Sequence, residues 1–238
     1  MAGESERKVR KFWDEQAEAF GADPSATLTD HYLRGLEIAT IQRYIRERNP
    51  KRVVDIGCGN GFSTVQFAAA FSDVAFVGVD YSREMIRHAR DGERPNCAFL
   101  WGDVLDPATL PDSSFDVVLT QRCIQNILDR NLQTRAIRNM LTLKSDDGVL
   151  LLMECSKPGL RQFNRLSQGV NPHRPPKREP FHNLWLEDRD LRREFGAHVE
   201  YFCSTYMIGK AIHPRLQRIC CRLPQVGAFG YDRLFIIR

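Results

Sequence analysis

The segment from Val53 to Gly61 constrains this chain more than any other, and it reads Val-Val-Asp-Ile-Gly-Cys-Gly-Asn-Gly. An apolar β-branched run ends in an acid, and alternate glycines follow before an apolar helical stretch begins. This pattern predicts a strand that breaks into a tight turn, where the backbone bends sharply and lies close to a ligand. A second acid, Asp80, ends another apolar run and is placed to accept hydrogen bonds from a ribose. The two segments together indicate a nucleoside-containing cofactor.

The spacing of the glycines bears on which cofactor it is. A dinucleotide-binding turn has a third glycine three residues after the second, which brings a helix N-terminus to the pyrophosphate. That position is Phe62 here, so the dinucleotide spacing is absent. Asp55 would also repel a pyrophosphate, whereas it suits a ligand with an ammonium or sulfonium charge. On this segment alone, a generic glycine turn of an α/β protein stays open as an alternative.

These residues resemble the class I S-adenosylmethionine-dependent methyltransferases, whose first motif has the form of Val53 to Gly61 and whose second ends in an acid like Asp80. The resemblance covers roughly residues 30 to 156. It implies S-adenosyl-L-methionine as the cofactor and S-adenosyl-L-homocysteine as the product. It also implies an α/β, Rossmann-like fold, with a mostly parallel seven-stranded sheet in the order 3-2-1-4-5-7-6, helices on both faces and an insertion after the fifth strand.

The alternation of apolar runs predicts the elements of one domain, residues 1–238. The predicted strands are 52–56, 74–79, 98–101, 115–120, 149–154, 199–204 and 231–237, with a turn at 147–148 leading into the fifth. The predicted helices are 4–20, 30–48 with Asp30 as its cap, 62–71, 83–90, 132–143, 186–195 and 214–222. Residues 1–48 form N-terminal helices. Residues 157–180 are rich in proline and are expected to be extended or turning, within an insertion, 157–185, that covers the active site.

Composition limits the choice of compartment and partner. The seven cysteines are scattered without a CxxC pair, which is typical of thiols in a reducing cytoplasm. No apolar run is long enough to cross a bilayer. The net charge of +4 is mild, and its local concentrations at Arg161–Arg178 and Arg215–Arg222 are interpreted as solvated faces. We therefore expect neither a nucleic-acid nor a membrane partner, and leave the oligomeric state open between monomer and homodimer.

In an open α/β sheet, ligands bind beyond the carboxyl ends of the strands. Asp80 is assigned to the ribose, Tyr81 and Met85 to the adenine ring, and Asp103, by the resemblance, to the adenine amino group. For Met85 a core role is the alternative, and for Asp103 a turn cap. The predicted cofactor-binding residues are Asp55, Gly57, Gly59, Gly61, Asp80, Tyr81, Met85, Gly102, Asp103, Val104 and Gln121. Cys58 lies in the turn and is expected to pack rather than react.

Residues after the later strands are assigned to the substrate, by a looser resemblance to bacterial small-molecule methyltransferases of polysaccharide or natural-product pathways. Glu154 and His182 are the predicted catalytic residues, because a histidine can remove a proton at neutral pH. A structural role is the alternative for each, and a metal site that includes His182 is disfavoured because HxH and HxxxH spacings are absent. The predicted substrate-binding residues are Arg122, Asn126, Asn164, Arg165, Asn183 and Tyr206.

The sequence thus predicts an N- or O-methyltransferase of a small polar molecule. Methyl transfer from a sulfonium is an in-line displacement that depends mainly on alignment. Two other classes stay open: a methyltransferase of RNA or of protein side chains, and a non-catalytic protein that binds S-adenosylmethionine. The first is disfavoured because Gln121-Arg122-Cys123-Ile124 stands where an Asn/Asp-Pro-Pro-Tyr motif would be.

Overall fold

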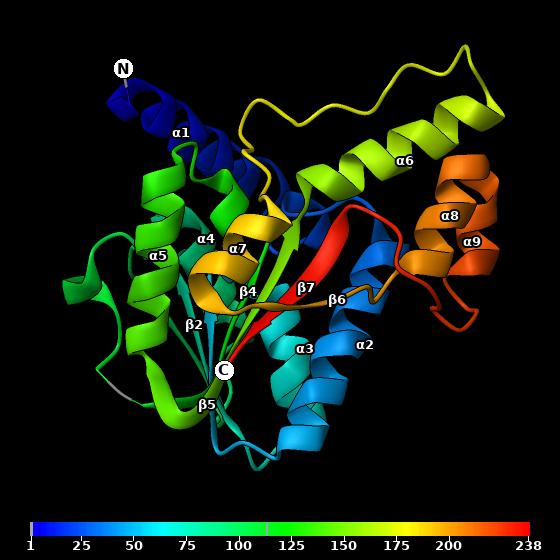
Figure 1. Cartoon of the computed structure of the whole chain (residues 1–238). Coiled ribbons are helices and arrows are strands. Elements are labelled where there is room, and N and C mark those ends of the chain that lie inside the picture. Colours follow the sequence, from blue (N-terminus) through cyan, green and yellow to red (C-terminus); the bar gives the residue numbers. More distant parts are fainter. Residues whose placement is uncertain (1, 113) are drawn as a thin grey trace.

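The apolar runs of the sequence form the strands of one sheet in the computed structural model, which describes residues 2–112 and 114–238 (Figure 1). The strands are β1 (Arg52–Ile56), β2 (Ala75–Asp80), β3 (Cys97–Trp101), β4 (Phe115–Gln121), β5 (Lys144–Cys155), β6 (His198–Glu200) and β7 (Asp232–Ile237). Their order in the described residues is β3-β2-β1-β4-β5-β7-β6. The strands from β1 to β5 pair in parallel, and β7 is antiparallel to both β5 and β6. The predicted order and mostly parallel sheet are confirmed.

Helices cover both faces of the sheet. They are α1 (Ala2–Phe20), α2 (His31–Arg48), α3 (Phe62–Ala70), α4 (Arg83–Ala89), α5 (Arg130–Thr142), α6 (Lys157–Val170), α7 (Asp188–Phe195), α8 (Ser204–Ile212) and α9 (Gln217–Cys220). Neighbouring residues of a strand face opposite sides, so each strand contributes to two cores. Val53 packs with α2 and α3, whereas Val54 packs with α5 and α7.

Side-chain caps explain where several helices begin. Asp30 accepts a hydrogen bond from the Leu33 N–H (3.1 Å) at the start of α2, as predicted. That helix ends at Asn49, which adopts a left-handed conformation. Ser156 accepts from the Gly159 N–H (3.0 Å) at the start of α6, next to a proline in the first turn.

Three local predictions after β4 were wrong. Residues 157–170 form helix α6 rather than an extended segment, because the proline cluster begins only at Pro172, beyond the helix end. The strand predicted at 199–204 is shorter, and α8 begins at Ser204, where the sequence lacks a strong helical period. Strand β5 begins at Lys144 rather than after a turn at 147–148, with a register shift opposite Phe115 and Val117.

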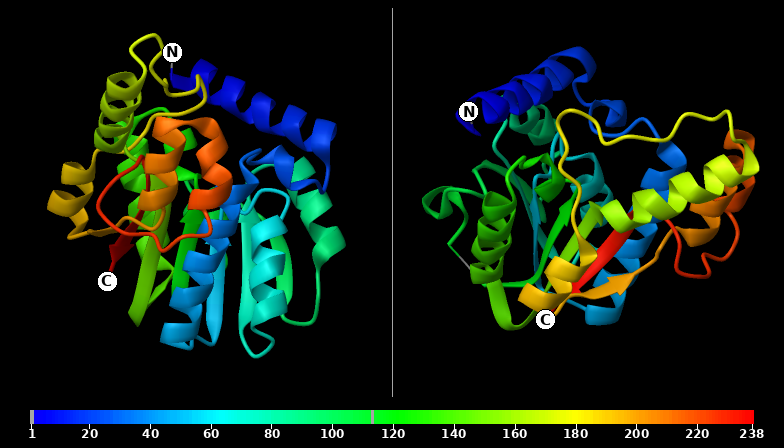
Figure 2. Two further views of the ribbon diagram at one scale, coloured as in Figure 1. Left: turned by 90° about the vertical axis from the view of Figure 1, so that its right-hand side faces the viewer. Right: turned by 45° about the horizontal axis from the view of Figure 1, so that its top comes forward.

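Two segments cover the carboxyl edge of the sheet. Helix α1 lies across this edge, and residues 171–187 run back from the end of α6 toward α1, as both views of Figure 2 show. They meet where Phe12 of α1 stacks on His182, with ring centroids 4.3 Å apart. We call residues 171–187 the strap. The Leu184 backbone fixes its far end, since its N–H donates to the Gln125 carbonyl (2.6 Å). Among the described residues, no helix is both long and apolar enough to span a bilayer.

Candidate active site

The glycine turn after β1 has the geometry that its sequence predicts. Gly57, Gly59 and Gly61 have φ angles of 75°, 57° and 77°, in the left-handed region that favours glycine. A Cβ on Gly57 would lie 2.5 Å from the Cys123 Cβ, and one on Gly59 would lie 2.7 Å from the Thr27 Cγ2. The turn is therefore open only to glycine, and its backbone faces a cavity at the carboxyl edge of the sheet.

Asp55 brings a partly unsatisfied carboxylate to this cavity. The side chain is buried, and its Oδ2 accepts a hydrogen bond from the Thr64 hydroxyl (2.6 Å). Its Oδ1 has no partner among the described residues. Burial, opposed by the Thr64 hydrogen bond and assisted by the neighbouring Asp80 charge, raises the pKa of Asp55 to about 7. A cationic ligand group would offset this burial.

Asp80 lies at the end of β2 and also lines the cavity. Its Oδ2 accepts from the Gly59 N–H (2.9 Å) and its Oδ1 from the Ser82 N–H (2.8 Å), so it holds the glycine turn against β2. Burial raises its pKa to about 6, although these two backbone donors lower it. An ionised carboxylate can accept about four hydrogen bonds, so two positions are left for a ligand.

Helix α1 forms one wall of the cavity. Arg10 pairs with Asp103, and its guanidinium carbon lies 4.5 Å from the centre of the Tyr81 ring. The Oδ1 of Asp103 accepts from the Leu105 N–H (2.9 Å), which is the turn-capping arrangement. The Tyr81 hydroxyl has no partner among the described residues, and burial raises the pKa of this side chain. Arg10 thus bridges Tyr81 and Asp103, two of the three residues that the sequence assigned to the adenine.

Two charged residues of α2 were missed by sequence reasoning. Arg34 lines the cavity, and its Nη2 donates to the carbonyls of Pro24 (2.6 Å) and Leu28 (2.8 Å). Its Nε is buried without a partner among the described residues. Burial, together with the nearby Arg122 charge, lowers the pKa of Arg34 to about 10. The signal was present in the sequence, because Arg34 and Glu37 interrupt the apolar face of a helix.

Arg122 occupies a strained position at the end of β4. Its φ is 56°, and its backbone N–H donates to the Met153 carbonyl (2.8 Å). Its guanidinium lines the cavity and pairs with the fully buried Glu37. Non-glycine residues held at positive φ often belong to functional sites. Glu37 neutralises part of the positive charge of Arg122. Less of that charge is therefore left for the substrate anion that the sequence predicted Arg122 to bind.

Glu154 is buried and does not line the cavity. Its carboxylate accepts from the backbone N–H groups of Cys123 and Ile124 (both 3.0 Å) and of Gln125 (3.1 Å). Burial raises its pKa to about 7, against these three donors. The geometry makes Glu154 the anchor of the loop after β4, which presents Arg122 and Asn126 to the cavity.

The structure divides the predicted site residues into two sets. Those that line the cavity are Asp55, Gly57, Gly59, Asp80, Tyr81, Met85, Asp103, Val104, Gln121, Arg122 and Asn126. Those that do not are Gly61, Gly102, Glu154, Asn164, Arg165, His182, Asn183 and Tyr206. Trp13 and Thr27 are further lining residues that the sequence did not indicate.

Most residues of the second set are engaged in the protein's own contacts. Asn164 exchanges hydrogen bonds with the Lys177 backbone (2.9 and 2.8 Å), and Tyr206 donates to the buried end of Asp30. Arg165 is exposed on α6. The Asn183 amide, in the orientation that satisfies both its ends, donates to the Asn126 side chain (2.7 Å).

His182 contacts α1, where its ring stacks on that of Phe12. Its Nδ1 is buried without a partner among the described residues, and burial lowers its pKa. In the parts of the chain that the structure describes, no cluster of three or more His, Cys, Asp or Glu residues is arranged to hold a metal ion.

Comparison with known proteins agrees with this architecture. A family model described as "Methyltransferase domain" matches residues 47–190. The ubiquinone/menaquinone biosynthesis C-methyltransferase of Vibrio parahaemolyticus is 29% identical over 137 residues, which are 55% of this chain and 51% of that protein. The ajmaline N-methyltransferase of Rauvolfia serpentina is 28% identical over 168 residues, which are 68% of this chain and 50% of that protein. The chain thus spans about half the length of these relatives.

A solved structure shows the same fold over nearly the whole chain. The magnesium protoporphyrin IX methyltransferase of Synechocystis PCC 6803, with bound S-adenosylhomocysteine, superposes with a TM-score of 0.63 at 14% identity and covers 98% of this chain and 99% of that one. The sheet order and the glycine-turn cavity are those of a class I S-adenosylmethionine-dependent methyltransferase. The chain belongs to the methyltransferase-domain family, and its cofactor is S-adenosylmethionine.

The residues of the cavity fit this cofactor. S-adenosylmethionine carries an ammonium, a carboxylate, a sulfonium and a ribose. The orphaned Asp55 Oδ1 suits the ammonium, and the unpartnered Nε of Arg34 suits the carboxylate. The turn between them presents glycine backbone to the cavity, so a ligand can approach it without a side chain in the way.

Proposed function

We propose that the protein transfers the methyl group of S-adenosylmethionine to a nitrogen or oxygen atom of a small polar molecule. The observation that carries this proposal is the covering of the cavity. Trp13 and Arg10 of α1 line the cavity, and the strap packs on the outside of α1 through His182. A covered cavity suits a small substrate, because a macromolecule needs an open groove at the reacting atom.

The chain's own residues would position the donor. The cofactor supplies a methyl group already activated on a sulfonium, so the protein contributes alignment and electrostatics. Asp55 and Arg34 would hold the two charged groups of the methionine part. Asp80 would accept from the ribose hydroxyls, and Asp103 with Val104 would face the adenine. For Asp103 to accept from the adenine amino group, Arg10 would share or release this carboxylate.

The acceptor would lie by the loop after β4. Gln121, Arg122 and Asn126 line that part of the cavity, and Glu154 holds their loop in place. We assign Glu154 and His182 to positioning roles, since neither lines the cavity. The relatives named for ajmaline and for ubiquinone/menaquinone biosynthesis support a small molecule as the substrate.

A labelling experiment tests the substrate class directly. The purified protein is incubated with S-adenosylmethionine labelled in its methyl group and with a cleared bacterial extract, and the products are separated by ultrafiltration. The proposal predicts a labelled small molecule in the filtrate that chromatography separates from unreacted S-adenosylmethionine. The control is Gly57→Ala, which disrupts the glycine turn and should form no such product. Label retained with protein or RNA would contradict the proposal, as would cofactor binding without any transfer.

A further inference from the structure

One end of the molecule is basic and exposes aliphatic side chains. It comprises residues 165–178 and 210–226, and we call it the basic end. Between Tyr201 and Tyr231 the chain has no Asp or Glu, and it has none between Ser156 and Arg178 either. The left view of Figure 2 faces this end, where α8 and α9 lie beside the end of α6.

The basic end is held together as one surface. Arg174 of the strap donates to the Ser167 hydroxyl of α6 (2.9 Å) and pairs with the Ala211 carbonyl of α8. Gly209 of α8 packs so closely on α9 that a Cβ there would lie 2.5 Å from the Cys220 Sγ. The segments that carry the basic residues are therefore fixed relative to one another.

Aliphatic side chains project from this surface. Val226 is 66% exposed, Ile219 59%, Val170 50% and Leu223 46%. Ile219 and Leu223 line a shallow, mostly apolar depression together with Arg218 and Arg222. Exposed aliphatic residues that gather on one surface often mark a binding site.

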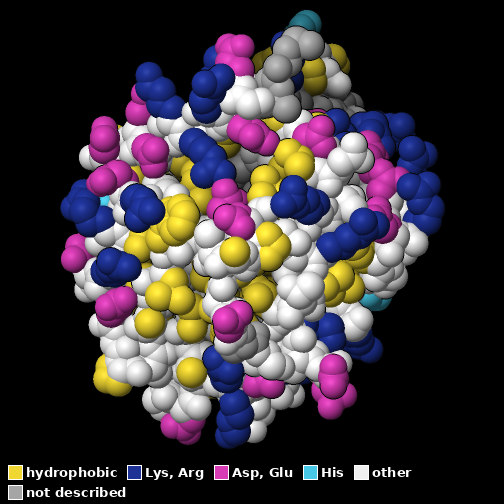
Figure 3. Space-filling model, turned by 90° about the vertical axis from the view of Figure 1, so that its left-hand side faces the viewer, with side chains coloured by type: hydrophobic (Ala, Val, Ile, Leu, Met, Phe, Trp, Pro, Cys, Tyr) yellow, Lys and Arg dark blue, Asp and Glu magenta, His cyan; other side chains and the backbone are white. Residues whose placement is uncertain are grey.

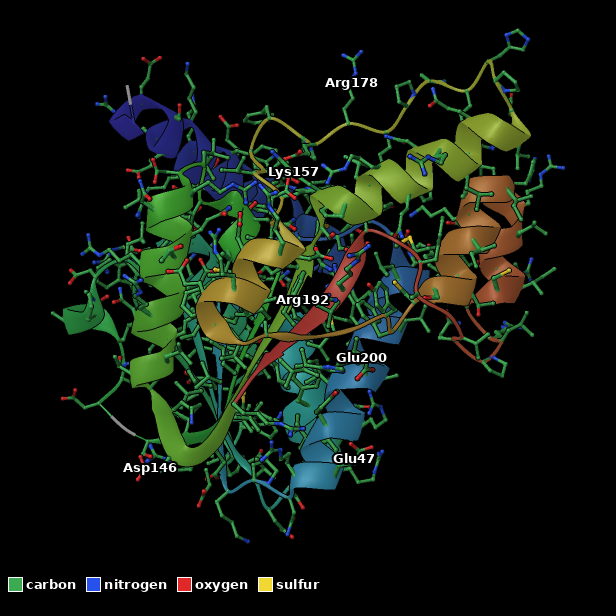
Figure 4. All side chains as sticks on the ribbon, viewed as in Figure 1. Glu47, Asp146, Lys157, Arg178, Arg192 and Glu200 are labelled. Carbon is green, nitrogen blue, oxygen red and sulfur yellow. The ribbon has the colours of Figure 1, made fainter. Side chains whose placement is uncertain are left out.

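The arginines between them have no acidic partners. Arg215, Arg218 and Arg222 are exposed, and none of them takes part in a salt bridge within the described residues. Arg178 points outward from the strap in Figure 4, whereas Glu47 and Asp146 lie toward the opposite end. By contrast, acidic and basic side chains are mixed over the face seen in Figure 3. The basic end thus carries positive charge without acidic side chains between its arginines.

The unpaired arginines and exposed aliphatic side chains of the basic end favour one class of binding partner over others. A second copy of the chain placed symmetrically would bring arginine against arginine, which is unfavourable. Single-stranded nucleic acid is bound by aromatic side chains on which bases stack, and the exposed apolar residues here are aliphatic. They project from the end of α6, from α9 and from the segment after α9 rather than lining one deep groove, so a soft surface suits them better than a rigid helix. Arginine beside exposed aliphatic residues is a combination that suits the interface of an anionic bilayer, where cations meet lipid phosphates and apolar side chains meet the acyl boundary.

We propose that the basic end binds the surface of membranes that contain anionic phospholipids. Arg215, Arg218 and Arg222 would contact lipid phosphates, while Ile219 and Val226 would enter the boundary with the acyl chains. This inference goes beyond the methyl transfer and does not depend on it. It also revises the expectation, drawn from composition, that these residues form merely solvated faces.

The test is co-sedimentation with vesicles. One set contains phosphatidylcholine alone, and the other contains about one third phosphatidylglycerol. We expect the full chain to bind the anionic vesicles at least about tenfold more tightly, and R218E/R222E to lose about tenfold or more of that affinity. I219S/V226S should weaken binding several-fold, because it removes the inserted side chains. R189E/R192E changes two exposed arginines of α7 in the same way and should bind as the unchanged chain does.

Several results would overturn the proposal. They are equal binding to both sets of vesicles, no binding to either, an equal loss in R189E/R192E, or full binding by I219S/V226S. Tighter binding to polyuridylic acid than to anionic vesicles, lost in R218E/R222E, would assign the surface to nucleic acid instead. Each variant is also titrated with S-adenosylmethionine, and unchanged affinity for this cofactor shows that the variant is folded.

Discussion

The glycine turn after β1 takes its shape from the conformation of its own backbone, whereas the loop after β4 and the strap take theirs from distant contacts. In the first region, Gly57 and Gly59 have positive φ angles, which glycine adopts without strain. In the second, Glu154 holds residues 123–125 from thirty residues away, and Phe12 of α1 packs on His182. The glycine turn of the donor site therefore follows from a short sequence motif. The loop of the acceptor site follows from contacts between residues that are far apart in the sequence.

The largest effect is expected from Gly57→Ala. The new Cβ would meet Cys123, and φ would remain at 75°, so the turn would have to rearrange. We expect affinity for S-adenosylmethionine to fall by roughly a hundredfold or more, measured by calorimetry. Gly196→Ala is the matched control, because Gly196 has a φ of 63° but nothing within 4 Å of the new Cβ. It should lower stability by about 1 kcal/mol and leave affinity unchanged. Equal losses in both would show that strain alone explains the effect.

Arg34→Met should have the next largest effect. It removes a buried guanidinium whose Nε is free to bind the cofactor carboxylate. A hydrogen bond to a charged group contributes about 1.5–3 kcal/mol, so we expect the dissociation constant for S-adenosylmethionine to rise about 10- to 100-fold. Arg192→Met, on the exposed side of α7, is the control. A variant that binds the cofactor as tightly as the unchanged chain would remove Arg34 from the site.

Asp80→Ala should weaken binding of S-adenosylmethionine by about tenfold or more. It removes acceptors for the ribose and also the bond that holds the Gly59 N–H. The same titration with methionine alone separates these effects, since methionine lacks the ribose. If Asp80→Ala bound the cofactor normally, the ribose assignment would be wrong.

Binding should also depend on pH through Asp55. Its pKa in the folded chain, about 7, lies above that of an unfolded aspartic acid, so the carboxyl keeps its proton on folding and stability falls as pH rises from about 4 to 7. A cationic ligand favours the ionised carboxylate, so affinity should rise over this range, by at most about tenfold per pH unit, and level off above it. Calorimetry at several pH values measures this dependence of affinity on pH. Asp55→Asn should remove the change in affinity near pH 7, because asparagine does not ionise. An affinity that falls as pH rises from 5.5 to 7 would oppose the assignment.

His182→Phe should have the smallest effect. The change keeps an aromatic ring against Phe12 but removes any proton acceptor. A positioning role predicts that kcat changes by less than about threefold, whereas a general base would contribute about 10²- to 10⁴-fold. The two roles also differ in the pH profile of kcat, which a positioning residue leaves unchanged. A loss of a hundredfold with a changed profile would restore His182 as the catalytic base.

The sequence predicted the sheet and the donor side well, because both depend on short-range patterns. The β1 strand, the α2 cap at Asp30 and the glycine turn follow from apolar runs and glycine spacing. The order of the strands came from the resemblance to a family, since alternation alone does not define it. Helix α6 was missed because the proline-rich composition of 157–180 as a whole predicts extended backbone, although the prolines after Pro158 all follow the helix.

The acceptor side was predicted less well for a physical reason. Glu154 and Tyr206 were chosen for their place after a strand, but the chain turns their polar atoms toward its own backbone and side chains. On the donor side, Arg34 was overlooked because it lies on a helix rather than after a strand, and only the packing of α2 brings it to the cavity. Contacts such as these join residues that are far apart in the sequence, and they form only when the whole chain has folded.

Titration of the purified chain with S-adenosylmethionine by calorimetry tests the central claim most directly. The account predicts saturable binding of one cofactor per chain, with S-adenosylhomocysteine competing for the same site and NAD showing none. Absence of binding to S-adenosylmethionine, or tighter binding to NAD, would contradict the assignment of the glycine turn and its cavity.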